Sequence, residues 1–350
     1  MHDGKFQNIE QRIAFVKEKE EQGTYSKISN YFELAWQAGR GYEREEDQYQ
    51  RCRKLLHKEI YKFICVGGLN DRVVNKPFGY PGDYLTIYYY FLEYSGEQTY
   101  NILINQYSRS IPVAVAHRNR INRLMTEFKA ISKPGGTIMS VGCGPAIEIQ
   151  RASCESNFKN NNFLLFDVKK EAINFVRQKL PHPPENVKLF SSSLLGLLKS
   201  LKGQDFRDDG KDLIYCFGLY DYLEDRLAGI MLKALYDNLN PGGKLIVTNV
   251  SSTVPDRGYF EFFAQWDLIL RTHTEMLSLA QKYTPEAHTW VEYDLETGTN
   301  IYLYLEKHCP PTLEDLIISN QIVQMCNIEP LNNIRPFIRA GYLLSSGFSP

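Results

Sequence analysis

Short apolar runs alternate with helical segments along the second half of the chain. The runs at residues 137–141, 163–166, 187–190, 212–217 and 244–249 are apolar enough for buried strands. Helices are expected after them, at residues 146–153, 170–179, 225–239 and 259–283. This alternation predicts a doubly wound, mostly parallel sheet that binds a ligand at its carboxyl edge.

Two final runs change the pattern. Residues 289–294 and 300–306 flank the turn Glu296-Thr-Gly-Thr299 and predict an antiparallel hairpin. The expected architecture is therefore an α/β fold with a mostly parallel seven-stranded sheet and an antiparallel final hairpin.

Residues 1–130 predict an N-terminal helical cap and substrate region. Helices are expected at residues 9–19, 28–37, 43–66, 84–95 and 113–131, and the loop from Asn75 to Tyr84 carries two prolines and two glycines. The sheet domain is expected at 131–307. A C-terminal extension at 308–350 is expected to contain a helix at 313–326, after the break at Cys309-Pro-Pro311.

Composition narrows the function classes. With 43% hydrophobic residues the 350-residue chain can bury a full core, and its net charge of −1 gives no electrostatic basis for binding nucleic acid. None of the seven cysteines forms a Cys-x-x-Cys pair, which favours reduced thiols in the cytoplasm and no metal site. The polar N-terminus predicts no signal peptide, and no apolar run approaches the roughly 18 residues of a membrane span.

The turn after the first strand carries the most informative chemistry. Gly142 and Gly144, with Cys143 between them, allow positive φ and let a ligand approach the backbone. The next helix begins with free N–H groups, which suit a nucleotide-like or carboxylate-bearing ligand. The spacing differs from the dinucleotide pattern G-x-G-x-x-G, because Ile147 stands at the third glycine position.

Carboxylates near this turn are candidate ligand contacts. Asp167 follows Gly144 by 23 residues at a strand end, where it can accept both ribose hydroxyls of a nucleoside or cap the next helix. Glu148 either complements the helix dipole or reaches an α-amino group. Val168 and Ser192 lie where adenine contacts are expected, although 191–193 also fits an ordinary polar loop.

The segment after the fourth strand emerges at the same edge. Gly218 allows close approach, and Asp221 can face the cleft; Tyr220 and Tyr222 either line it or belong to the core. Among basic residues, Arg118 and Arg120 either clamp an acidic group or are solvated. His117 and His288 are possible general bases that form no metal signature.

These motifs resemble those of class I S-adenosylmethionine (SAM) methyltransferases. The resemblance rests on Val141-Gly-Cys-Gly-Pro-Ala, Asp167 and the turn Asn240-Pro-Gly-Gly, across residues 130–307. The chain departs from the pattern at Ser140, where an acidic residue is common, and at Ala146, where a third glycine is common. The resemblance implies SAM as cofactor. The closing antiparallel hairpin distinguishes the methyltransferase variant of the fold from nucleotide dehydrogenases.

A narrower resemblance includes the cap. Four motifs are similar to those of the bacterial 3-hydroxypalmitic acid methyl ester biosynthesis family: Lys76-Pro-Phe-Gly-Tyr-Pro-Gly-Asp-Tyr84, Ala116-His-Arg-Asn-Arg120, Gly218-Leu-Tyr-Asp-Tyr-Leu223 and Trp266-Asp-Leu-Ile-Leu-Arg-Thr272. The resemblance implies methyl transfer to a fatty-acid carboxylate, which makes a quorum-sensing ester.

This interpretation assigns roles to the remaining site residues. Tyr80 and Gly82 are expected to close over SAM, and Asp83 to pair with its α-amino group or orient the acceptor. A carboxylate acceptor needs no strong base at neutral pH, so it needs an anchor instead. The anchors expected are Arg118, Arg120 and Arg271, with Tyr220 and Asp221 beside the reacting atoms.

Three alternatives remain open from the sequence. An N- or O-methyltransferase of another small molecule would need a base such as Asp83, Asp221 or His288. A degenerate fold would bind SAM without turnover. A nicotinamide dehydrogenase is the weakest alternative, because of Ile147 and the final hairpin. The oligomeric state and the acceptor are not determined by the sequence.

Overall fold

The computed structural model describes residues 50–309 except 52, 55–56, 59–60, 62–64, 66, 94–99, 132–134, 156–157, 181–184, 204–209 and 256. The chain separates into two compact units, Met1–Lys307 and His308–Pro350. Every helix and strand given below belongs to the first unit. The helices expected at residues 9–19, 28–37 and 313–326 lie outside the described residues, as does part of the one at 43–66.

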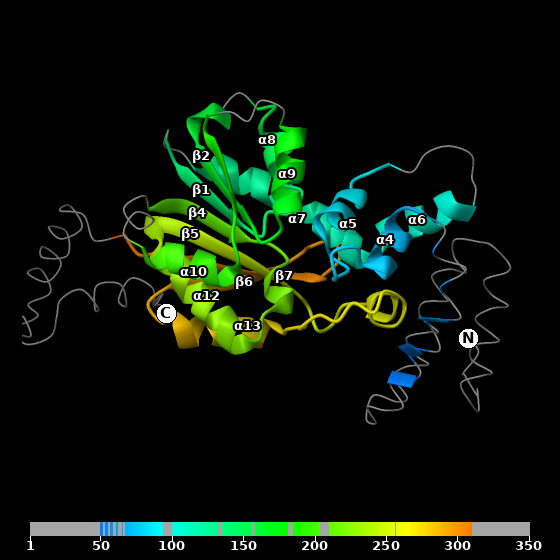
Figure 1. Cartoon of the computed structure of the whole chain (residues 1–350). Coiled ribbons are helices and arrows are strands. Elements are labelled where there is room, and N and C mark those ends of the chain that lie inside the picture. The colour runs from blue at the N-terminus through cyan, green and yellow to red at the C-terminus, as the bar shows by residue number, and fades with distance from the viewer. Residues whose placement is uncertain are drawn as a thin grey trace, which may run out of the picture. The chain divides into compact units, whose positions relative to one another are not determined.

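A seven-stranded sheet in the order β3-β2-β1-β4-β5-β7-β6 forms the centre of this unit (Figure 1). Its first five strands pair in parallel, and β7 runs antiparallel to both β5 and β6. The strands are β1 Thr137–Val141, β2 Asn162–Asp167, β3 Val187–Ser191, β4 Lys211–Cys216, β5 Leu239–Val250, β6 His288–Tyr293 and β7 Asn300–Glu306. The expected fold class is therefore confirmed.

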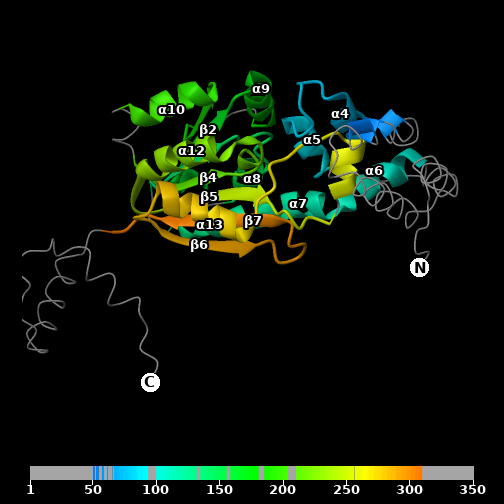
Figure 2. The same ribbon diagram turned by 90° about the horizontal axis from the view of Figure 1, so that it is seen from below.

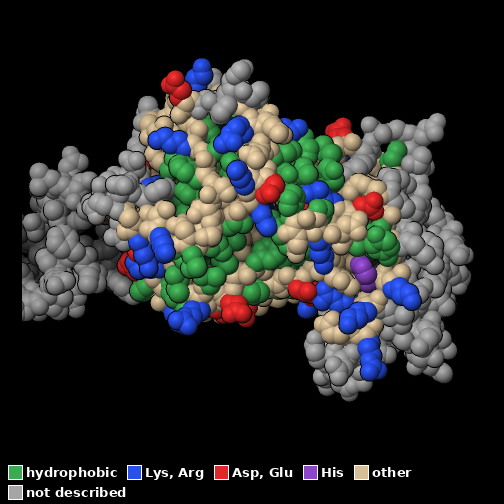
Figure 3. All heavy atoms as spheres, in the orientation of Figure 1, with side chains coloured by type: hydrophobic (Ala, Val, Ile, Leu, Met, Phe, Trp, Pro, Cys, Tyr) green, Lys and Arg blue, Asp and Glu red, His purple; other side chains and the backbone are tan. Residues whose placement is uncertain are grey.

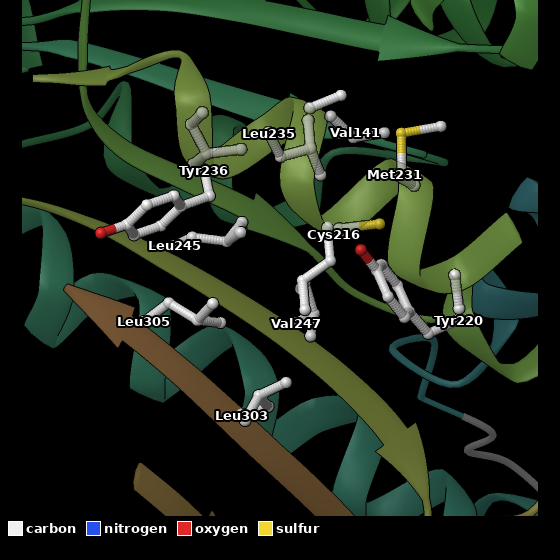
Figure 4. Close-up of a cluster of buried hydrophobic side chains, with 14 of the residues drawn as sticks. Val141, Cys216, Tyr220, Met231, Leu235, Tyr236, Leu245, Val247, Leu303 and Leu305 are labelled. Atoms are coloured by element: carbon white, nitrogen blue, oxygen red, sulfur yellow. The ribbon is translucent and has the colours of Figure 1, made fainter. Parts of the chain in front are cut away.

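Alternating side chains of the central strands enter two separate hydrophobic cores. Met139 and Ile214 point to one face, where they pack against α10, α12 and α13. Ile138 and Leu213 point to the other face, against α7, α8 and α9. These helices are α7 Pro112–Ala130, α8 Ile147–Ala152, α9 Lys170–Lys179, α10 Leu194–Lys202, α12 Asp225–Asp237 and α13 His273–Tyr283. Figure 4 shows part of the first core, between the sheet and α12.

The cap contains α4 Leu69–Asn75, α5 Tyr84–Tyr89 and α6 Tyr100–Ser110, which lie beyond one end of the sheet with the start of α7 (Figures 1 and 2). Its core includes a segment from far along the chain, because Val250, Val254 and the π-helical turn Tyr259–Phe263 pack among the cap side chains. The cap and the segment after β5 therefore fold around one another.

The helix expected at 259–283 is wrong, because the chain breaks in its middle. After the π-helical turn, Gln265 takes a positive φ of 48°. A new helix, α13, then begins at a capping box in which Thr272 and Glu275 satisfy each other's backbone N–H groups.

The remaining differences are smaller. The expected turn Asn240–Gly243 lies inside β5, where the pairing with β4 shifts register between Lys211 and Leu213. Helix α5 ends at Tyr89, earlier than the sequence predicts. The helices α4, α6 and α10 were not expected; they are only seven to eleven residues long, which leaves few apolar repeats to recognise.

Candidate active site

A cleft of about 310 Å³ lies where the carboxyl ends of the parallel strands meet the cap. The sheet order reverses between β1 and β4, and open α/β sheets bind ligands at such a switch point. Most of the predicted site residues line the cleft: Tyr80, Gly82, Gly142, Cys143, Gly144, Glu148, Asp167, Val168, Ser192, Gly218 and Asp221.

The glycine turn forms the floor of the cleft beyond β1. Gly142 and Gly144 have φ values of 71° and 53°, which non-glycine residues adopt only with strain. The N–H groups of Gly142 and Cys143 both donate to the Phe166 carbonyl at 2.9 Å, which ties the turn to β2. A Cβ at Gly144 would meet nothing within 4 Å, so the backbone here is open to a ligand.

Asp167 joins this turn to the end of β2. Its Oδ2 accepts a hydrogen bond from the Gly144 N–H at 2.9 Å, and its Oδ1 accepts one from the Lys169 N–H at 2.8 Å. Burial raises the pKa of the carboxyl, while these backbone hydrogen bonds act in the opposite direction. Because each oxygen has a second lone pair, the carboxylate can still accept two hydroxyl donors from the cleft.

Glu148 is the acidic group at the other end of the glycine turn. Its Oε1 accepts a hydrogen bond from the Tyr215 hydroxyl at 2.8 Å, and the side chain is almost fully buried. Burial raises its pKa to about 7. The carboxyl is therefore poised to ionise when a cation enters the cleft.

The loop from Lys76 to Tyr84 closes one side of the cleft. Tyr80 and Gly82 line it, and a Cβ at Gly82 would lie 2.4 Å from Trp266 Cζ2 and 2.6 Å from the Tyr222 hydroxyl. Trp266 Nε1 donates to that hydroxyl at 2.8 Å. Only glycine fits where the loop crosses these two side chains.

Asp83 does not face the cleft, and this corrects its predicted role. It caps α5, where Oδ1 accepts from the N–H groups of Leu85 and Thr86 at 2.8 and 3.1 Å. The same oxygen lies 2.8 Å from Arg72 Nε, in an ion pair whose carboxylate is fully buried. Oδ1 thus holds the loop and the helix together, and the fully buried carboxylate does not reach the cleft.

Three further assignments are corrected. Arg118 donates to the carbonyls of Tyr90 and Arg109, away from the cleft, because it lies one residue around α7 from the cleft-facing positions. Tyr220 is fully buried in the core beneath α12. Arg271 is also buried, and it donates to the Tyr220 and Leu223 carbonyls and pairs with Asp225.

Arg120 is the predicted anchor that reaches the cleft. It is 4% exposed, its Nη2 donates to Asn300 Oδ1 at 2.5 Å, and its Nε has no partner among the described residues. Its Nη1 would lie 3.2 Å from a Cβ at Gly218. Nearby Asp221 accepts from the Val250 N–H at 2.6 Å. Burial raises the pKa of this carboxyl, and the Arg120 guanidinium acts in the opposite direction.

His117 was not among the site residues that the sequence favoured, yet it lines the cleft one helical turn from Arg120. The signal was present as a helical period. Positions 113, 117, 120, 121 and 124 recur at three- and four-residue spacing, and all five side chains of α7 face the cleft.

The walls nearest the cap are apolar and aromatic. They combine side chains from α5, the start of α7 and the segment after β5: Tyr84, Ile87, Phe91, Val113, Tyr259, Phe260, Trp266 and Leu268. This half of the cleft suits an apolar ligand, whereas the half over the glycine turn is polar.

Two kinds of feature are absent from the described residues. No helix there is long and apolar enough to cross a membrane. No group of three or more His, Cys, Asp or Glu side chains is arranged there to hold a metal ion.

Comparison with known protein families and with curated proteins found no match. Among solved structures, a possible exported protein from Bordetella parapertussis is similar at 16% identity and a TM-score of 0.52, over 63% of this chain and 77% of that one. Magnesium protoporphyrin IX methyltransferase from Synechocystis, with bound S-adenosylhomocysteine (SAH), is similar at 12% identity and 0.46, over 68% and 98%. N-methyltransferase NodS from Bradyrhizobium japonicum, in complex with SAH, is similar at 14% and 0.40, over 57% and 89%.

At these identities the likeness concerns the fold alone. The mostly parallel seven-stranded sheet, the antiparallel final hairpin and the glycine turn after β1 are those expected from the sequence resemblance. The chain therefore has the fold class that its resemblance to class I methyltransferases implies.

Proposed function

We propose that this protein is a SAM-dependent methyltransferase that acts on a small molecule. The observation that carries the proposal is the hydrogen bond between Asp167 and the Gly144 N–H, which fixes a strand-end carboxylate beside an open glycine turn. The cleft at this point is large enough for a nucleoside with a methionine tail.

SAM is the cofactor, and different residues of the cleft contact its ribose, adenine, methionine tail and sulfonium. Asp167 accepts the ribose hydroxyls, and Val168 and Ser192 flank the adenine. The methionine tail crosses Gly142, Cys143 and Gly144, and Glu148 receives the α-ammonium. Tyr80, Gly82 and Gly218 surround the sulfonium, which carries an already activated methyl group.

Because the methyl group is already activated, its transfer mainly requires that the donor and the acceptor are positioned and that water is excluded. The loop from Lys76 to Tyr84 supplies both, because Gly82 packs against Trp266 and Tyr222 over the cleft. Arg120 and Asp221 lie beside Gly218, next to the expected site of transfer.

The acceptor we propose is the carboxylate of an apolar acid. Arg120 is almost fully buried and lines the cleft, and a guanidinium suits a carboxylate. The aromatic and aliphatic walls toward the cap accommodate its apolar part. The sequence resemblance extends this proposal to 3-hydroxy fatty acids and to a signalling ester as product.

Charge supports a small acceptor over nucleic acid. The net charge is −1, and on the face in Figure 3 the Lys and Arg side chains are dispersed among apolar and acidic ones. A phosphate backbone therefore gains little long-range attraction.

The test combines titration with turnover. Purified protein is titrated with SAM by calorimetry and then incubated with labelled SAM and, separately, decanoate, 3-hydroxydecanoate, decylamine and RNA. We expect SAM binding and label in the carboxylic acids. Binding without transfer to any acceptor would favour the non-catalytic alternative, and label only in the amine would favour N-methylation with Asp221 as base.

A further inference from the structure

The ring of His117 is held in one tautomer. Its Nδ1 lies 2.7 Å from the carbonyl oxygen of Val113, one turn earlier on α7. A carbonyl oxygen can only accept, so Nδ1 carries the proton and Nε2 of the neutral ring keeps its lone pair.

Nε2 faces the open space of the cleft. No described residue forms a hydrogen bond with Nε2. The atom is accessible to solvent, because it is absent from the buried unpaired atoms of the described residues. Since His117 lines the cleft, the accessible space at Nε2 is the cleft itself.

The groups around the ring keep it neutral. Arg118 and Arg120 approach it from α7 and Tyr90 from the end of α5, with ring centroids 5.5 Å apart. Burial and the two guanidinium groups together lower the pKa of His117 well below its usual range. The lone pair is therefore available throughout the neutral pH range.

A carboxylate acceptor makes no use of this lone pair, because it has no proton to give up. A hydroxyl acceptor does need a proton acceptor beside the transferring methyl group. We propose that the cleft also methylates acidic hydroxyl groups, phenols or enols, with His117 Nε2 as the general base and Arg120 stabilising the developing oxyanion. This inference rests on the proposed SAM site.

The step balances within the cleft. The hydroxyl proton moves to Nε2 as the oxygen forms its bond to the methyl carbon. The carbon–sulfur bond breaks and its electron pair stays on sulfur, which leaves the neutral thioether. The positive charge passes from sulfonium to imidazolium, so no additional net charge is buried. The imidazolium proton leaves when the product is released and water enters.

Two features select the acceptor class. His117 is a weak base in this environment, so the hydroxyl must itself be acidic, which favours a phenol over an aliphatic alcohol. The walls toward the cap include aromatic side chains against which a phenol ring can pack, among them Phe91, Phe260 and Trp266.

The experiment measures methyl transfer from labelled SAM to 4-nitrophenol, 4-chlorophenol, benzyl alcohol and decanoate. The variants are His117→Phe, which removes the base, and His117→Gln, which keeps a hydrogen-bond acceptor without a proton-accepting nitrogen. His288→Ala is the matched control, because that imidazole lies on β6 with a 63% exposed side chain. SAM affinity and circular dichroism are measured for every variant.

We expect the wild type and His288→Ala to methylate the phenols and not benzyl alcohol. Both His117 variants should lose about 100-fold in phenol methylation, the usual size of a general-base effect, while the SAM dissociation constant changes less than about threefold. Full phenol activity in either folded His117 variant would overturn the inference. SAM binding with decanoate methylation but no phenol methylation would also overturn it and would leave the proposed function standing. Absence of SAM binding would instead remove the proposed function itself.

Discussion

Asp167 has two partners before any ligand arrives. Its oxygens accept hydrogen bonds from the N–H groups of Gly144 and Lys169. The carboxylate therefore stabilises both the glycine turn and the segment that leads into α9. The sequence left open whether it binds ribose or caps the helix. In the structure Lys169 occupies the cap position, and Asp167 faces the cleft with lone pairs to spare.

Replacement of Asp167 by Ala should weaken SAM binding by about 1–3 kcal/mol, because charge-assisted hydrogen bonds to the ribose are lost. Calorimetric titration measures this loss. Asp237→Ala, which removes an exposed carboxylate paired with Lys233 on α12, should leave the affinity unchanged. Equal affinity in wild type and a folded Asp167→Ala protein would contradict the ribose assignment.

Glu148 should make SAM binding depend on pH. Its pKa in the free protein is about 7, and the SAM ammonium favours the ionised form, so binding releases a proton below that pH. Affinity should rise roughly fivefold from pH 6 to pH 7 by this linkage. Glu148→Gln should remove the rise, as calorimetry at several pH values would show.

Glu148 should also make the stability of the ligand-free protein depend on pH, with a trend opposite to that of SAM affinity. Because burial raises the folded-state pKa above the unfolded value, the native state binds the additional proton between about pH 4.5 and 7. Its contribution to the free energy of unfolding therefore falls as pH rises through that window. Urea titrations of wild type and Glu148→Gln should diverge there, and parallel curves would show that Glu148 is not protonated in the fold.

At the scale of elements, two loops decide the shape of the cleft. The loop from Lys76 to Tyr84 comes from the cap, and residues 251–272 follow β5, yet Gly82, Tyr222 and Trp266 bring them into contact. Lys76 Nζ adds a hydrogen bond to the Gln265 carbonyl at 2.8 Å. The acceptor half of the cleft exists because these distant segments meet.

Gly82→Ala should therefore disturb both stability and SAM binding. Its Cβ would overlap Trp266 and the Tyr222 hydroxyl, and overpacking of this kind costs about 1–3 kcal/mol. Gly79→Ala in the same loop is the matched control. It has a positive φ of 86° but no atom within 4 Å of the added Cβ, so it should lower stability with little effect on SAM affinity. Equal SAM affinity in Gly82→Ala would argue against the loop as part of the site.

Arg271 should behave as a structural residue. Its guanidinium joins the turn at Tyr220–Tyr222, β5 and α12 through the Tyr220 carbonyl, Asn249 and Asp225. Arg271→Lys cannot reproduce this fork of donors and should lower the free energy of unfolding by about 2–4 kcal/mol, leaving buried acceptors unpaired. Arg120→Lys should instead reduce turnover with decanoate. If Arg271→Lys lost turnover without losing stability, the residue would be an acceptor anchor after all.

At the scale of the molecule, the cap and the sheet have separate cores with the cleft between their side chains. Cap residues and the segment after β5 form one core, and each face of the sheet forms another. A ligand that contacts both the cap loop and the strand ends therefore stabilises the unit as a whole.

SAM at 100 times its dissociation constant should raise the free energy of unfolding by about 2.7 kcal/mol, by mass action. Thermal melts with SAM, SAH and NAD measure the effect. NAD should give no shift, because Ile147 stands where the dinucleotide pattern has the glycine that lets the helix pack closely against the strand. Stabilisation by NAD and not by SAM would favour the dehydrogenase alternative.

The sequence by itself determined the sheet and the cofactor half of the cleft. Strand periodicity, the Gly142–Gly144 turn and Asp167 at a strand end are local features, and the parallel sheet brings them to one edge whatever surrounds them. The final hairpin was equally clear from its turn. The residues at the strand ends that are expected to contact SAM line the cleft for this reason.

Only the tertiary structure decided the acceptor half. Four residues have suitable side chains but are held by other contacts. Asp83 caps a helix, Arg118 and Arg271 donate to backbone carbonyls, and Tyr220 packs in the core. His117 carries the same chemistry as His288, and only packing turns one toward the cleft while the other stays exposed. The type of each side chain and the local spacing of apolar residues can be taken directly from the sequence. Which polar group remains unpaired depends on contacts between segments far apart in the chain, and the fold alone sets these.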